Sequence, residues 1–186
     1  MLRPMSLALL IVVALLAQSA SSAVKWNYRI GEPAPEFQLK TLDGKDYGSN
    51  DLKGKWVVLG FMTTWCPFCN AAAPHFEKLN QEYGKRGVLS IVVDIEERSK
   101  TVAGWAKKHK LSGPVLLDSK AEVANRYAPP ADFAPDLKRQ EVMIASFVII
   151  DPDGTVRFLS LNEDTANFDA RLTKLRAALD GLLPKQ

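Results

Sequence analysis

Two cysteines, Cys66 and Cys69, are the only ones in the chain, and Pro67 and Phe68 lie between them. The thiolate form of cysteine, not the thiol, is the nucleophile that attacks disulfides. Two thiols at this spacing can close and reopen one disulfide. The pattern therefore predicts redox chemistry in which Cys66 attacks and Cys69 resolves the mixed disulfide.

Three other interpretations of the pair remain open. A structural disulfide over so short a loop would constrain the unfolded chain little. A metal site needs about four ligands, and one Cys-x-x-Cys with the separate His75 and His109 supplies too few. A chance pair is the third interpretation. The residues around the pair favour the redox interpretation, because a strand, a tryptophan and a helix in this order are typical of redox motifs.

The flanking elements place Cys66 where a strand meets a helix. The apolar run Trp56–Met62 predicts a strand buried on both faces. Residues 67–83 predict a helix, with Pro67 in the first position, where its missing N–H costs nothing. The unpaired N–H groups and the dipole of a helix N-terminus favour a thiolate. We therefore expect the pKa of Cys66 to lie below the usual value of about 8.5.

Strand-like and helix-like segments alternate through the rest of the chain, which predicts an α/β sandwich with a mixed sheet. An Asp-Gly turn at residues 43–44 follows a short strand near residues 37–39. Further strands are predicted at 88–94, 114–117, 143–150 and 155–160, and the last two flank a tight turn. Helices are predicted at 101–110, from a capping box at 119–122 to Tyr127, and over 168–179 with Gly181 at its end.

Motifs along most of the chain resemble one protein family. The segment from Trp65 to Cys69 resembles the active site of the thioredoxin superfamily. Residues 30–39 and 147–154 resemble the entry motif and a later strand of its TlpA/ResA-like branch, which is related to the AhpC/TSA peroxiredoxin family. The resemblance implies a thioredoxin-like fold over residues 24–186, with a central mixed β-sheet flanked by helices and an N-terminal β extension.

The resemblance also implies which residues contact a substrate. Trp65, Pro67 and Phe68 flank the thiols, and Trp65 and Phe68 are expected to be exposed. The family places a cis-proline opposite the cysteines, and the matching position here is Ala145. Ile144 and Ala145 are therefore expected to line the substrate site. Their peptide bond is expected to be trans, since a non-proline cis bond costs about 2.5–4 kcal/mol.

One position that often holds a buried Asp or Asn in the family is Gly60 in this sequence, and one that carries a Glu in many reductive members is Ala72. A buried carboxylate can accept the proton of the resolving thiol. Without it, water or another base must deprotonate Cys69, and slower or altered reductase chemistry is expected. Residues 128–142 are longer than the family's segment and are predicted to be a loop at the rim of the site. That loop is either a partner-binding lip or a solvated insertion.

The N-terminus predicts export. Arg3 precedes an apolar run of 11 residues at positions 7–17, and small residues end at Ala23, which is typical of a signal peptide over residues 1–23. The predicted location is the periplasm. The alternative is an uncleaved anchor that leaves the domain facing the periplasm. The net charge of +3 falls to +2 without Arg3, too mild to imply nucleic acid or a membrane surface as a partner.

The sequence as a whole predicts an exported thiol–disulfide oxidoreductase that needs no metal or organic cofactor. We expect it to act as a monomer on disulfides or dithiols of other proteins, and the resemblance implies a membrane-bound redox partner. One alternative is a peroxiredoxin-like peroxidase, since Thr63 precedes Cys66 as in that motif, although Leu59 replaces its proline. The other alternative is a binding module with a redox-silent pair.

Overall fold

A computed structural model describes residues 29–161 and 165–184, so the predicted signal peptide at 1–23 lies outside the described residues. In chain order the elements are β1 (Gln38–Thr41), β2 (Asp46–Gly48), η1 (Ser49–Leu52), β3 (Trp56–Met62), α2 (Pro67–Gly84), β4 (Val88–Ile95), α3 (Ser99–Lys108), β5 (Val115–Asp118), α4 (Glu122–Tyr127), α5 (Arg139–Met143), β6 (Ser146–Ile150), β7 (Val156–Ser160), η2 (Thr165–Asn167) and α6 (Thr173–Leu182). In this part of the chain, no helix is long and apolar enough to cross a bilayer.

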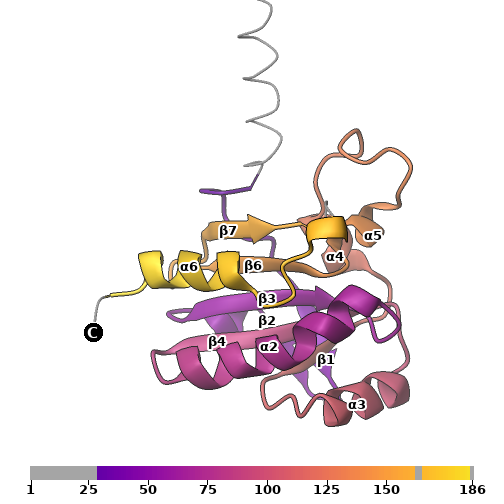
Figure 1. Ribbon diagram of the computed structural model, residues 1–186, viewed down its shortest axis with the longest axis horizontal. Coiled ribbons are helices and arrows are strands. Elements are labelled where there is room, and N and C mark those ends of the chain that lie inside the picture. Colours follow the sequence, from indigo (N-terminus) through magenta and orange to yellow (C-terminus); the bar gives the residue numbers. More distant parts are fainter. Residues whose placement is uncertain (1–28, 162–164, 185–186) are drawn as a thin grey trace, which may run out of the picture.

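The seven strands form one mixed sheet in the order β2-β1-β5-β4-β3-β6-β7 (Figure 1). The strands β3, β4 and β5 run parallel to one another, whereas β6 is antiparallel to β3 and β7 is antiparallel to β6. The β1–β2 hairpin turns at Gly44, where φ is +82°, and β1 pairs antiparallel with β5. The predicted mixed sheet and N-terminal β extension are confirmed.

Alternate residues of β3 face two separate apolar layers, as expected for a strand covered on both sides. Val58 and Met62 pack with side chains of α2, α3 and α6, in one core cluster that also contains both cysteines. Leu59 and Phe61 pack with α4 on the other face, where the rings of Phe61 and Tyr127 lie 5.3 Å apart. The central strand is thus packed on both faces, and the chain passes from its carboxyl end into α2.

The predicted strands and helices before residue 119 agree with the structure to within two residues at each end. Differences begin after β5. The capping box at 119–122 is wrong, because α4 begins after Ala121 in the left-handed region with no side-chain cap. The Asp118 carboxylate accepts a hydrogen bond from the Ala124 amide at 2.8 Å instead. A buried carboxylate from the preceding strand thus replaces the local cap.

Several further boundaries differ from the sequence prediction. Residues 128–142 were expected to be loop throughout, but α5 begins at Arg139, and the strand expected from residue 143 begins at Ser146. The cause is Ala145, whose φ of +63° interrupts the extended chain just before β6. The last helix was expected over 168–179, but α6 begins at Thr173, because Leu172 before it lies in the left-handed region. Gly181 does not end this helix, since α6 continues to Leu182 and the chain becomes extended at Leu183.

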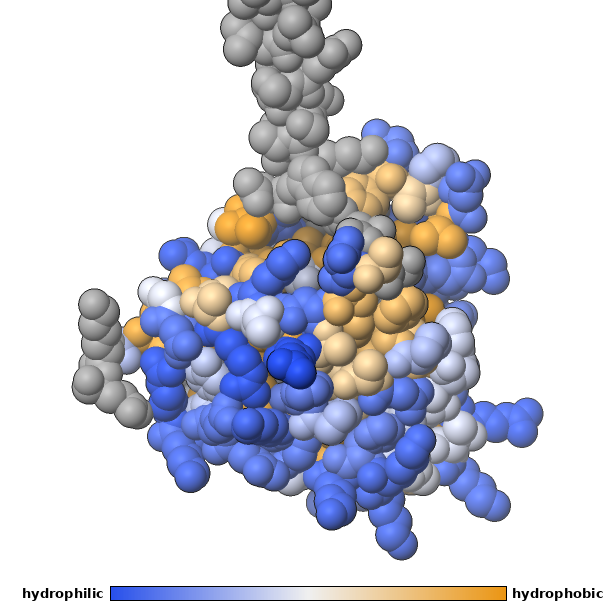
Figure 2. All heavy atoms as spheres, in the orientation of Figure 1, coloured by the Kyte–Doolittle hydropathy of each residue, from blue (hydrophilic) through white to orange (hydrophobic). Residues whose placement is uncertain are grey.

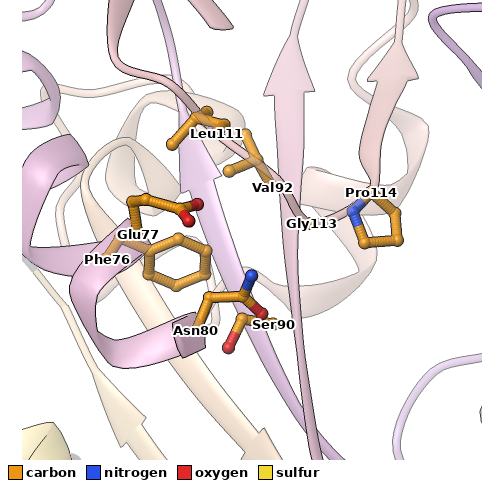
Figure 3. A pocket seen from close by; sticks show the side chains of 8 residues that line it. All are labelled: Phe76, Glu77, Asn80, Ser90, Val92, Leu111, Gly113 and Pro114. Atoms are coloured by element: carbon orange, nitrogen blue, oxygen red, sulfur yellow. The ribbon is translucent and has the colours of Figure 1, made fainter. Parts of the chain in front are cut away.

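A small cavity lies between α2, β4 and the segment before β5 (Figure 3). Glu77, which is buried, accepts hydrogen bonds there from the Ser112 amide at 2.8 Å and the Ser112 hydroxyl at 2.7 Å. This contact fastens the segment before β5 to the helix. Neither cysteine lines this cavity.

Candidate active site

Cys66 caps the N-terminus of α2, as the sequence predicts. Its backbone is extended, Pro67 occupies the start of the helix, and the Cys69 amide donates to Cys66 Sγ at 3.5 Å. A helix cap in this conformation aims its side chain at the free N–H groups of the first turn. The sulfur of Cys66 therefore receives the hydrogen bonds and the positive dipole end that stabilise a thiolate.

The two cysteines are free thiols, and their pKa values are shifted in opposite directions. Hydrogen bonds from the Cys69 thiol and from the backbone amides of Cys69 and Phe68 lower the pKa of Cys66 to about 6, against the opposing effect of burial. The hydrogen bond to Cys66 and burial raise the pKa of Cys69 far above the ordinary thiol value. At neutral pH, Cys66 is therefore the thiol that ionises more readily, and Cys69 holds its proton.

Ala145 is brought to the thiol pair, as the resemblance implied. No cis peptide bond occurs in the described residues, so Ile144–Ala145 is trans as expected. The Ala145 amide donates to the Phe61 carbonyl at 2.9 Å, and the Ala145 backbone lies near enough to the Cys69 thiol to lower the pKa of that thiol slightly, against the larger raising effects. Ile144 is partly buried beside it. The left-handed turn at Ala145 thus puts backbone, rather than a proline ring, against the second cysteine.

The expected exposure is confirmed for Trp65 and wrong for Phe68. Trp65 is 66% exposed, and Pro67 is exposed next to it. Phe68 is only partly exposed, because its ring packs against Phe168 with the centroids 5.1 Å apart. Figure 2 shows a patch of apolar side chains near the end of the molecule where α2 begins. Trp65, not Phe68, is the large side chain that can reach a partner.

The two positions that were expected to lack an acid leave no space for an acidic side chain. A Cβ atom on Gly60 would lie 3.0 Å from the Met62 methyl and 3.1 Å from the Phe76 ring, and Ala72 is fully buried.

Thr63, considered above for peroxide chemistry, contacts Cys69 and not Cys66, because its amide donates to Cys69 Sγ at 3.5 Å. Within the described residues, no group of three or more His, Cys, Asp or Glu side chains is placed to hold a metal ion.

Asn70, which the sequence analysis did not single out, holds the chain that leads into the helix. Its Nδ2 donates to the carbonyls of Thr64 and Cys66, each at 2.8 Å. Its Oδ1 accepts from Trp105 Nε1 at 3.1 Å and lies 3.1 Å from His109 Nε2. The side chain therefore joins the loop before Cys66 to α3. A polar residue directly after the second cysteine was the available signal, but its partners lie far along the chain.

Glu97 holds the same loop from the other side. Its carboxylate accepts hydrogen bonds from the amide of Thr64 and, at 2.5 Å, from the Thr64 hydroxyl. Sequence reasoning missed Glu97, because nothing in the chain indicates that the turn after β4 reaches the loop after β3.

The segment near residues 128–138 projects from the end of the molecule at which α2 begins (Figure 1). Its expected place near the rim agrees with this view, and its role stays a prediction.

The sequence profile of the AhpC/TSA family matches residues 30–159, more than half of the chain. The chain belongs to the AhpC/TSA family. It is 35% identical over 106 residues to a thiol-disulfide oxidoreductase ResA of Bacillus cereus, covering 57% of this chain and 61% of that protein. The chain thus spans less than two thirds of this curated relative.

Solved structures confirm the predicted thioredoxin-like α/β fold. A secreted disulfide oxidoreductase of Mycobacterium tuberculosis, homologous to DsbE of E. coli, is similar with a TM-score of 0.61 and 25% identity, covering 78% of this chain and 96% of that one. Peroxidoxin BcpB of M. tuberculosis is similar with a TM-score of 0.66 and 23% identity, covering 84% and 99%. Because the identity to peroxidoxin BcpB is only 23%, this second similarity shows the fold alone.

Proposed function

We propose that this chain is a thiol–disulfide oxidoreductase that uses Cys66 and Cys69 to exchange disulfides with other proteins. The observation that carries the proposal is the division of roles between the thiols. Cys66 caps α2 with a pKa lowered to about 6, and Cys69 keeps its proton directly beside it. The similarity to a thiol-disulfide oxidoreductase named ResA supports the same activity.

The exchange proceeds in two steps that balance sulfur, protons and electrons. The Cys66 thiolate attacks one sulfur of a partner disulfide, a mixed disulfide forms, and the leaving sulfur takes up a proton. Cys69 then loses its proton and attacks Cys66 Sγ, which releases the second partner thiol. The pair ends as a disulfide and the partner gains two electrons, and the reverse sequence oxidises a partner dithiol.

Trp65, Pro67 and the Ile144–Ala145 segment form the proposed contact surface for a partner. Trp65 offers a large exposed apolar face beside the nucleophile, and Ala145 lies against the second thiol. Only 3% of Cys66 is exposed, so a partner disulfide has to approach closely past these residues. Aromatic side chains of this kind supply much of the contact energy at protein interfaces.

The proposed location is the periplasm, reached through a signal peptide over residues 1–23. The apolar run at 7–17 and the small residues that end at Ala23 support it. The similar M. tuberculosis structure is described as a secreted disulfide oxidoreductase, which agrees with such a location. We propose that the domain acts there as a monomer and exchanges electrons with a membrane-bound partner.

Trapping of the mixed disulfide tests the function. Residues 24–186 carrying Cys69→Ser should form a stable mixed disulfide with a disulfide-containing protein, because the resolving thiol is gone. The matched Cys66→Ser variant should trap nothing. Equal trapping by both variants, or by neither, would contradict the proposed roles. Consumption of hydrogen peroxide by the wild-type chain, without exchange of protein disulfides, would favour the peroxidase instead.

A further inference from the structure

One buried acid near the active site takes no part in the chemistry proposed above. Asp94 belongs to β4, is 1% exposed, and its Oδ1 atom has no hydrogen-bond partner among the described residues. Burial and the nearby charge of Glu97 raise the pKa of Asp94 to about 8. A carboxyl buried in this way stays protonated at neutral pH unless a cation compensates its charge.

The sheet places Asp94 on the face that carries the cysteines. Asp94 pairs with Met62 in the parallel register of β3 and β4. Paired residues of parallel strands point to the same face of a sheet, and Met62 belongs to the core cluster that contains Cys66 and Cys69. Both strands also end here, so Asp94 lies at the carboxyl edge from which the chain enters the active site.

Glu97 links this acid to the active-site loop. Both oxygens of its carboxylate are engaged by Thr64, one by the amide and one by the hydroxyl. Thr64 directly precedes Trp65 and lies two residues before Cys66. Hydrogen bonds to an ionised acceptor are about twice as strong as neutral ones, so the contact is strongest while Glu97 is charged. Asp94 faces that carboxylate, and two carboxylates this close cannot both ionise without cost.

We propose that Glu97 and Asp94 act together as positioning residues for disulfide exchange. Ionised Glu97 holds Thr64, and through it Trp65 and Cys66, as long as Asp94 keeps its proton. When Asp94 ionises, repulsion between the two carboxylates weakens the hold on Thr64 and the reaction slows. This inference rests on the proposed function of the cysteine pair.

The other titratable groups around Asp94 do not reverse this effect. A second buried acid at the end of β5, Asp118, adds negative charge and also raises the pKa of Asp94. The imidazole beyond α3 has its pKa lowered by burial, so it brings no compensating positive charge at neutral pH. This imidazole belongs to His109, which lies 3.1 Å from Asn70 Oδ1.

The pH profile of the reaction tests the pair. The reduced chain of residues 24–186 is mixed with glutathione disulfide, and the rate constant is measured from acidic to alkaline pH. The wild-type rate should rise as Cys66 ionises and then fall roughly threefold as the pH passes the Asp94 titration at about 8. Asp94→Asn, which cannot ionise, should keep the rise and lose the fall. A fall that persists unchanged in Asp94→Asn would overturn the proposal.

A second variant keeps the test decisive if Asp94→Asn fails to fold. Glu97→Gln should slow the reaction roughly tenfold at neutral pH, because it removes a charged acceptor from Thr64. The matched control Glu96→Gln changes the same charge at an exposed neighbour and should leave the rate unchanged. Equal rates for Glu97→Gln and Glu96→Gln would contradict the inference alone, whereas a wild-type chain that does not react with the disulfide would contradict the proposed function.

Discussion

At the scale of single residues, the two thiols of one short motif differ because only Cys66 caps the helix. We expect alkylation of Cys66 by iodoacetamide to rise with pH, reach half its maximum near pH 6, and level off before Cys69 reacts. The sign follows from a lowered pKa, since the thiolate predominates above that value. The measurement is the alkylation rate at each thiol by mass spectrometry. A midpoint near the ordinary thiol pKa of about 8.5 would contradict the capping account.

Asn70 is predicted to stabilise the loop before Cys66 as well as the helix. Asn70→Ala removes hydrogen bonds to two backbone carbonyls and leaves the Trp105 indole without its acceptor. Loss of such partners should lower the free energy of unfolding by about 1–3 kcal/mol, measured in urea. Asn80→Ala is the matched control on the same helix, because Asn80 makes one exposed contact to Ser112. Equal losses in the two variants would contradict the role given to Asn70.

The position of Cys66 at a helix start and the exposure of Trp65 could be predicted from the sequence, because both depend on local spacing. Asn70, Glu97 and Asp94 could not be assigned in this way. Their partners come from segments that meet only when β3, β4 and α3 are packed together. Phe68 was misjudged for the same reason, since Phe168 covers it from the other end of the chain.

At the scale of elements, β3 and α2 are packed so tightly around Gly60 that an acidic side chain cannot be introduced there. Gly60→Ala places a Cβ within 3.3 Å of Met62, Phe76 and Phe147, and overpacking of this kind costs about 1–3 kcal/mol. The matched control is Gly104→Ala in α3, where nothing lies within 4 Å of the new Cβ. That control should stabilise the protein by about 0.5–1 kcal/mol. The free energy of unfolding of both variants is measured in urea. A Gly60→Ala variant that is as stable as the wild type would contradict this close packing.

The strands and helices up to β5 follow apolar periodicity, and the sequence located them closely. The errors lie where the backbone leaves the common conformations. Ala121 and Ala145 adopt positive φ without being glycine, which no local pattern indicates. In both places the surrounding fold fixes the conformation: Asp118 bonds to the first turn of α4, and the Phe61 carbonyl accepts from Ala145.

At the scale of the whole molecule, we propose that the chain is exported to the periplasm. Expression of the full chain in a bacterium should yield periplasmic protein whose first residue is Val24, because signal peptidase reads the small residues that end at Ala23. N-terminal sequencing of the periplasmic fraction makes this measurement. Intact chains found only in the membrane fraction would support the anchored alternative and contradict cleavage.

The general architecture could be predicted because the family motifs extend over most of the chain, and the matched residues 30–159 cover most of the sheet. The role of residues 128–138 could not be derived in this way. This segment has no counterpart in the motifs, and the structure shows it as a projecting loop with Leu137 exposed (Figure 1). Its composition alone does not select a partner.

The central claim is that Cys66 and Cys69 form a reversible dithiol/disulfide couple, and equilibration of residues 24–186 with glutathione buffers tests it most directly. The account predicts one two-electron transition between the potentials of thioredoxin and DsbA, about −270 and −120 mV, because the stabilised Cys66 thiolate favours the reduced form. Mass spectrometry of the alkylated chain should show both cysteines oxidised together. A pair that never forms its disulfide in any buffer would contradict the account.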